Sequence, residues 1–180
     1  SAQYFGNEVD VAEVAATLRS HASQESPVGV TIMLDRDGGV GSEARPAPQW
    51  PPRPEGPRAL NGALDVAAVS TENVYLFHNT TNARFIDTLW RQHPGAEVVL
   101  YTNDVDDVAG ATGGNVAARI GGKWLTPPAE SGNVPTGYRN HLVAEGVVTE
   151  RPINRYDLLA ASEVSVIDDV HGWRAVQLAE

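Results

Sequence analysis

Two neighbouring carboxylates, Asp168 and Asp169, are the first candidates for proton transfer in this sequence. They end the segment EVSVIDD, whose apolar and β-branched residues indicate a strand. Carboxylates held together in a ligand pocket can divide the roles of general acid and general base. The alternative is a solvated turn with both side chains in water. The pair therefore points to acid–base catalysis on a small molecule, with the solvated turn as the competing interpretation.

A second candidate segment, HNTT, follows the apolar run VYLF. His78 can exchange a proton near neutral pH and is a candidate general base. The alternative is that its ring only packs or caps. Asn79 and Thr80 can donate hydrogen bonds to a carbonyl or carboxylate of a substrate, whereas Thr81 more simply caps a following helix. We take His78 and Asn79 as candidate catalytic residues beside the acidic pair.

Three aspartates near the middle of the chain raise the question of a metal. Asp104, Asp106 and Asp107 lie in a polar segment, but no downstream glutamate completes a Ca²⁺-binding loop. Cysteine is absent, which excludes disulfides and thiolate ligands. No nucleophile elbow, phosphate-binding loop or HExxH zinc motif occurs either. The sequence predicts no metal site.

These residues must be positioned by a mixture of helices and strands, so the fold class is α+β. Helices are predicted over 10–22, 81–92, 136–145 and 154–161, and strands over 28–35, 40–45, 63–69, 97–102, 147–153, 163–168 and 173–178. Residues 115–126 read as a hairpin with a two-glycine turn. The first helix starts with a capping pattern at Asp10 and Glu13. The helix 81–92 is expected to turn Phe85, Ile86, Leu89 and Trp90 inward, and 104–114 is expected to be a loop.

The chain changes character near its proline-rich stretch. Six of the twelve prolines lie between residues 46 and 57, which indicates an extended loop. We expect residues 1–70 to form a small domain that ends in a linker, and residues 71–180 to form a larger domain with a mixed sheet.

Composition narrows the range of partners. The 180 residues carry a net charge of −10, which disfavours nucleic acid and anionic membranes. No apolar run reaches the roughly 18 residues of a membrane helix. A small molecule or another protein is the expected partner, and the absence of cysteine fits the cytoplasm.

Five segments form a recognisable series along the chain: SAQYFG (1–6), FHNTTNARFID (77–87), VAGATGGNV (108–116), GGKWLTPPAESGNVPTGYR (121–139) and SVIDDVHGWRAV (165–176). Taken in this order, they resemble the class IV aminotransferases, the fold-type IV pyridoxal-phosphate (PLP) enzymes, and most nearly 4-amino-4-deoxychorismate lyase. The resemblance implies a D-amino acid aminotransferase-like fold, with an N-terminally shortened small domain and a larger mixed-sheet domain.

The departures from the family pattern concern the cofactor. Asn79 stands where the resemblance places the Schiff-base lysine, and an amide forms no imine. Gly110 stands where it places the glutamate that pairs with the pyridinium nitrogen. Asp168 and Asp169 stand where it places two donors to the phosphate, and carboxylates only accept. At about 4 Å and an effective dielectric of about 20, each pair of unit charges repels by roughly 4 kcal/mol. We therefore expect no PLP and no other cofactor.

The start of the chain differs as well. The resemblance implies an arginine helix and further strands before Ser1, and the phosphate-binding turn reads Pro135-Thr136-Gly137, with its glycine moved by one place. A natural truncation is favoured over a trimmed or tagged start. Homodimerisation is then expected to cover the exposed sheet edge.

The remaining pocket residues follow from the same resemblance. The resemblance places five residues around the vacated cofactor site: Thr80, Asn115, Thr136, Gly137 and His171. The alternative for His171 is a place in a surface turn. Arg139 is expected to form a structural salt bridge. The predicted function is a cofactor-free acid–base enzyme of isomerase, cyclase, lyase or hydrolase type that acts on a small organic metabolite. The first alternative is an inactive binding or partner protein, and the second is a residual PLP-dependent lyase.

Overall fold

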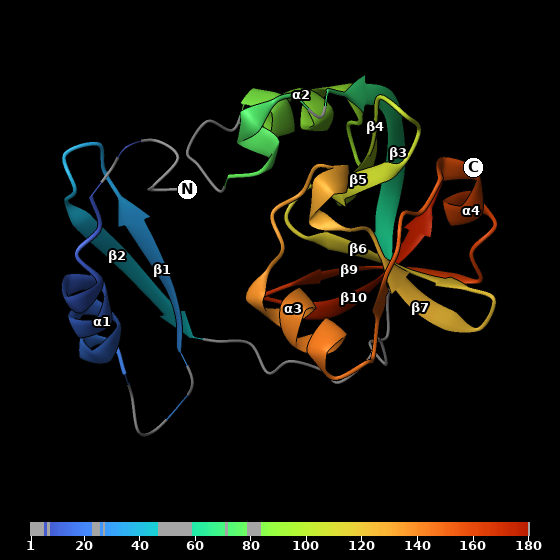
Figure 1. Cartoon of the computed structure of the whole chain (residues 1–180). Coiled ribbons are helices and arrows are strands. Elements are labelled where there is room, and N and C mark those ends of the chain that lie inside the picture. Colours follow the sequence, from blue (N-terminus) through green and yellow to red (C-terminus); the bar gives the residue numbers. More distant parts are fainter. Residues whose placement is uncertain are drawn as a thin grey trace. The chain divides into compact units, whose positions relative to one another are not determined.

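The computed structural model describes residues 6, 8–22, 26, 28–46, 59–70, 72–78 and 84–179, without the side chains of residues 67 and 68. Helices and strands are mixed along the chain, as predicted (Figure 1). The chain forms two compact units, Ser1–Gln49 and Trp50–Glu180. Within the described ranges, no helix is both long and apolar enough to cross a membrane.

The first unit holds one helix and one hairpin. Helix α1 spans Val11–Ser20, and the strands β1 (Val28–Leu34) and β2 (Val40–Pro46) pair antiparallel. The Asp10 carboxylate accepts hydrogen bonds from two backbone N–H groups of the first turn of α1, so the predicted cap is confirmed. None of the described residues of these three elements is buried.

The second unit is built on an eight-stranded sheet in the order β5-β4-β3-β10-β9-β6-β7-β8. β3 is parallel to its neighbours β4 and β10, β7 is parallel to β8, and the other pairs are antiparallel, so the sheet is mixed, as predicted. The strands are β3 (Leu60–Val69), β4 (Val98–Asn103), β5 (Val108–Ala111), β6 (Asn115–Ile120), β7 (Lys123–Thr126), β8 (Thr149–Glu150), β9 (Glu163–Asp168) and β10 (Gly172–Leu178).

Short helices connect these strands. They are η1 (Val74–Leu76), α2 (Arg84–Gln92), η2 (Ala129–Ser131), α3 (Gly137–Ala144) and α4 (Arg155–Leu159), where η marks a 3-10 turn. In Figure 1, α3 lies beside β9 and β10. Trp173 of β10 is buried under α3 and meets Trp124 edge to face, with ring centroids 4.8 Å apart. The turn between β9 and β10 is thereby held on a packed frame.

Four expectations differ from the structure. The segment 104–114 contains strand β5, whose small residues gave no strand pattern but pair with β4 at the sheet edge. The strand expected over 147–153 is limited to β8. Trp90 is 37% exposed, and Leu89 is the buried residue of α2. The two units divide after Gln49 rather than at residue 70, because β3 pairs with β4 and β10.

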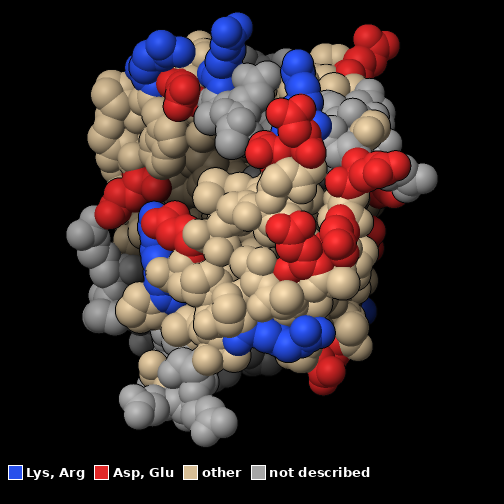
Figure 2. Space-filling model, turned by 90° about the vertical axis from the view of Figure 1, so that its left-hand side faces the viewer, with Lys and Arg blue, Asp and Glu red and all other residues tan. Residues whose placement is uncertain are grey.

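Charged side chains are spread over the face drawn in Figure 2. Acidic side chains occur at many points on this face, and the Lys and Arg side chains visible there do not merge into one patch. This pattern agrees with the net charge of −10.

The parallel contact of β3 with β10 gives a test of the frame. Gly62 has no room for a side chain, because an added Cβ would overlap Cγ1 of Val176 and lie 3.3 Å from Cδ2 of Leu178. Gly62→Ala is expected to lower the free energy of unfolding by about 1–3 kcal/mol, measured by urea denaturation. Gly41→Ala is the control, since its Cβ would make only ordinary contacts. Equal effects of the two substitutions would contradict the packing described here.

Candidate functional site

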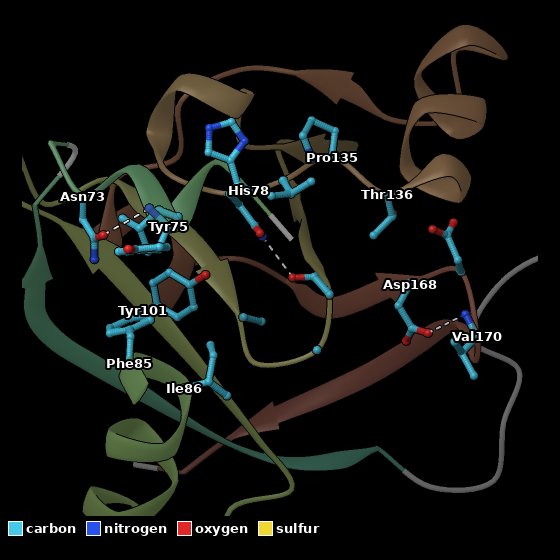
Figure 3. A pocket seen from close by; sticks show the side chains of 17 residues that line it. Asn73, Tyr75, His78, Phe85, Ile86, Tyr101, Pro135, Thr136, Asp168 and Val170 are labelled. Atoms are coloured by element: carbon cyan, nitrogen blue, oxygen red, sulfur yellow. Dashed lines mark hydrogen bonds between the residues drawn. The ribbon is translucent and has the colours of Figure 1, made fainter. Parts of the chain in front are cut away.

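A cavity of about 450 Å³ opens in the second unit, between η1, α2, β4 and the turn after β9 (Figure 3). This size suits a small organic molecule. One side is apolar and aromatic, with Leu76, Phe85 and Ile86. The other side is polar and includes Thr136 and Asp168, which Figure 3 shows at the opposite end from Phe85. The pocket can therefore hold a molecule with one apolar and one polar end.

Asp168 is buried at the end of β9, and its carboxylate is surrounded by donors. One oxygen accepts hydrogen bonds from the backbone N–H groups of Val170 and His171, at 2.8 and 2.7 Å. The other accepts from the guanidinium of Arg174 at 2.8 Å. The carboxylate thus closes the turn that leads into β10 and neutralises Arg174. Its position suits a structural acceptor, and proton transfer there would disturb the turn.

Asp169 points to a different element. Its two oxygens accept hydrogen bonds from the backbone N–H groups of Gly137, at 3.1 Å, and Tyr138, at 2.6 Å. These are first-turn donors of α3, which have no partner inside the helix. The Thr136 hydroxyl caps the same end by accepting from the N–H of Arg139. A carboxylate therefore sits where the helix dipole favours an anion. The two neighbouring carboxylates thus bind different elements, Asp168 its own turn and Asp169 the start of α3.

Asn115 lies behind the pocket rather than on its wall. Its amide donates to the carbonyl of Val134 at 3.0 Å and accepts from the N–H of Thr136 at 2.8 Å. It therefore fixes the loop that leads to α3. Arg139 is buried and binds the carbonyl of Pro127 and the carboxylate of Glu150, so the expected structural salt bridge is confirmed.

The histidines lie in different surroundings. His78 follows η1 and lines the pocket, half-buried. The His171 side chain is 57% exposed and contacts Asp168 through Nδ1 at 3.2 Å, as the alternative of a surface turn implied. Asn79, Thr80 and Thr81 lie outside the described residues. Gly137 is at the start of α3, where an added Cβ would lie 3.3 Å from an Asp169 oxygen.

The acidic segment 104–107 has partners of its own. The Asp106 carboxylate pairs with Arg155 at 3.4 Å, and Asp107 forms an isolated bridge with Asn154. Among the described residues no cluster of three or more His, Cys, Asp or Glu could hold a metal ion. These aspartates connect the end of β4 to α4.

Tyr101 is the pocket residue that sequence reasoning missed. It lies on β4 directly across from Gly110 of β5, and its ring meets Phe85 edge to face at 5.0 Å. A Cβ added at Gly110 would overlap the amide nitrogen of Asn133 and lie 2.7 Å from the Tyr101 hydroxyl. These two polar groups thus fill the space of a side chain at position 110. Burial raises the pKa of Tyr101 well above its ordinary value.

A family model described as amino-transferase class IV matches residues 1–179. The chain belongs to this family. Its sheet and helices have the fold-type IV PLP-enzyme arrangement, as predicted. No curated protein sequence matches the chain.

Solved structures of class IV proteins are similar in fold. A protein from Mesorhizobium loti, provisionally described as an amino-acid aminotransferase, has a TM-score of 0.80 at 23% identity over 99% of this chain and 86% of its own. A branched-chain aminotransferase from Thermoproteus uzoniensis, solved with norvaline, has a TM-score of 0.75 at 18% identity. The match covers 98% of this chain and 67% of that protein. A protein from Legionella pneumophila, provisionally described as a 4-amino-4-deoxychorismate lyase, has a TM-score of 0.66 at 18% identity. The match covers 77% of this chain and 52% of that protein. Identities this low establish the fold and leave the activity open.

Lysine is rare in this class IV chain. Lys123 is the only lysine in the 180 residues. It begins β7, is exposed and is not part of the pocket lining. The lining also contains no arginine among its described residues. A simple count of lysines would have revealed this feature from the sequence.

The buried hydroxyl of Tyr101 predicts a dependence of stability on alkaline pH. Because the native pKa lies above the ordinary value near 10, the unfolded state ionises first. The stabilisation is complete below pH 10 and is lost as pH rises further, by up to roughly 1.4 kcal/mol per pH unit. Tyr101→Phe removes this loss, so its unfolding free energy should fall less than that of the wild type between pH 9 and 11. Urea denaturation measures both; parallel curves would contradict the assignment.

Proposed function

We propose that this class IV protein works without PLP and uses its pocket to bind a small organic molecule. The observation that carries the proposal is the contact of the Asp169 carboxylate with the backbone N–H groups of Gly137 and Tyr138. A helix N-terminus is a ready site for a phosphate. Here a carboxylate of the chain itself occupies that site. An incoming phosphate would have to displace Asp169 or lie beside it as a second anion.

The opposite end of the pocket supports the same proposal. The family resemblance assigns to position 110 a glutamate that pairs with the cofactor ring. A side chain at Gly110 would overlap Asn133 and press on the Tyr101 hydroxyl. The space is thus filled from β4 and from the loop before α3. The residues present do not fit PLP at its ring end.

The third support is the absence of an anchoring amine in the described pocket lining. Lys123, the only lysine of the chain, lies at the exposed start of β7. Asn79 stands where the resemblance places the Schiff-base lysine. A residual PLP-dependent lyase is therefore the weakest of the three functions.

Binding and catalysis differ in what they require of the acidic pair. Asp168 is committed to the turn and to Arg174, and Asp169 to the start of α3. Ligand binding needs neither carboxylate to exchange a proton, so we place it first. A cofactor-free acid–base enzyme is the second candidate, favoured by the place of His78 in the lining. In that case His78 would be the base and Asn79 a hydrogen-bond donor.

We also propose that the chain forms a homodimer in the cytoplasm. None of the described residues of α1, β1 and β2 is buried. A helix and a two-stranded hairpin without a core require further contacts for stability. A second copy of the chain is the partner that we propose.

The proposal predicts that the wild-type chain retains no PLP. After incubation with excess PLP and gel filtration, the protein is expected to carry no absorbing cofactor. After borohydride reduction, mass spectrometry should detect adducts only at Lys123 or the terminal amine, as adventitious products. Lys123→Arg is the matched control and should remove the first of these. Stoichiometric PLP that survives gel filtration would contradict the proposal.

A second experiment separates the lost lysine from the occupied phosphate site. Asn79→Lys alone is expected to bind PLP no better than the wild type, because Asp169 still holds the N–H groups of α3. Asn79→Lys with Asp169→Ser replaces the acceptor by a possible donor and should gain at least about tenfold in affinity, or roughly 1.4 kcal/mol. Fluorescence titration with PLP measures both. Tight binding by the single variant would show that Asp169 does not block the site.

A further inference from the structure

The Tyr101 hydroxyl is a polar group without a hydrogen-bond partner among the described residues. Tyr101 is 3% exposed, and its ring is fixed against Phe85. Figure 3 shows the hydroxyl end of the ring turned into the cavity. The hydroxyl oxygen is not enclosed by protein atoms: it is open to the cavity, where water or a ligand oxygen can accept its hydrogen bond. The cavity in front of it is where a partner can be supplied.

The absence of a side chain at Gly110 leaves the Tyr101 hydroxyl uncovered. Gly110 faces Tyr101 in the β4–β5 register, and any side chain there would crowd the hydroxyl. Asn133, the other neighbour, donates one of its two amide hydrogens to the carbonyl of Gly114 at 3.0 Å. The hydroxyl is therefore open to a ligand from the cavity, and its ring is fixed in place by Phe85.

We propose that the Tyr101 hydroxyl donates a hydrogen bond to an uncharged acceptor oxygen, such as a ketone or amide carbonyl, of an aromatic ligand seated against Phe85 and Ile86. The proposal rests on the proposed function, because it names the ligand class of the same PLP-free pocket. It makes Tyr101 a specificity-determining residue rather than a catalytic one.

The charge of the lining selects the uncharged oxygen over a carboxylate. Asp168 and Asp169 both contribute to the wall, and no lysine or arginine does so among the described lining residues. Arg174 is already paired with Asp168. A carboxylate held at Tyr101 would thus find one phenolic donor and no cationic side chain in the described lining, which does not repay its desolvation.

The apolar wall selects the aromatic part. Phe85 and Ile86 stand next to Tyr101 in Figure 3, and Leu76 adds to the same side. Such a wall favours a flat apolar ring, and a cavity of about 450 Å³ admits one with substituents. A wholly apolar ligand would fill this space but would leave the hydroxyl without a partner.

A panel of three probes of similar shape tests the proposal on the full chain. Acetophenone offers an uncharged carbonyl, benzoate a carboxylate, and ethylbenzene neither. Ligand-observed NMR titration is expected to give the wild type a preference for acetophenone over ethylbenzene of about tenfold, or roughly 1.4 kcal/mol. Benzoate should bind more weakly than either.

Tyr101→Phe should abolish the preference for acetophenone and leave ethylbenzene binding unchanged or stronger. Tyr156→Phe is the matched control, because it deletes an exposed hydroxyl that accepts from Arg155 outside the pocket. Thermal unfolding checks that both variants are folded. A preference that persists in Tyr101→Phe overturns the inference.

The remaining outcomes separate this inference from the proposed function. If ethylbenzene binds the wild type as well as acetophenone does, or benzoate binds best, the ligand class is wrong but the small-molecule pocket stands. If no probe binds at millimolar concentration, both the ligand class and the proposed binding function fail.

Discussion

The contact between the Asp169 carboxylate and the first turn of α3 is the interaction on which the pocket depends. It satisfies backbone donors that the helix leaves without partners, and it fixes the turn after β9 to the start of α3. Thr136 and Asn115 hold the preceding loop in place. The anion that the helix dipole favours is thus a carboxylate of the chain itself.

The two adjacent aspartates illustrate how neighbours in sequence acquire separate roles. Asp168 turns back into its own loop and pairs with Arg174, while Asp169 reaches across to α3. Successive residues at a strand end point in opposite directions, so a shared proton between them is not favoured. The two carboxylates therefore bind different groups, and their role as an acid–base pair stays a prediction.

Sequence patterns predicted the elements whose signals are local. Asp10 caps α1, and Gly121-Gly122 form the turn of the predicted hairpin. They failed where pairing across the sheet decides the outcome. β5 is a strand because β4 binds it, and its small residues carry no periodic signal. The role of Tyr101 depends likewise on facing Gly110, a relation between strands that no single segment encodes.

The proposed function requires that the Asp169 carboxylate keeps a phosphate away from the N–H groups at the start of α3. The most direct measurement is a ³¹P NMR titration of PLP with the full chain, which follows the phosphate itself whether or not a covalent bond forms. If the proposal is right, the ³¹P chemical shift and line width of PLP stay unchanged at equimolar protein. A saturable shift or broadening that inorganic phosphate reverses would show that the site takes a phosphate, and would contradict it.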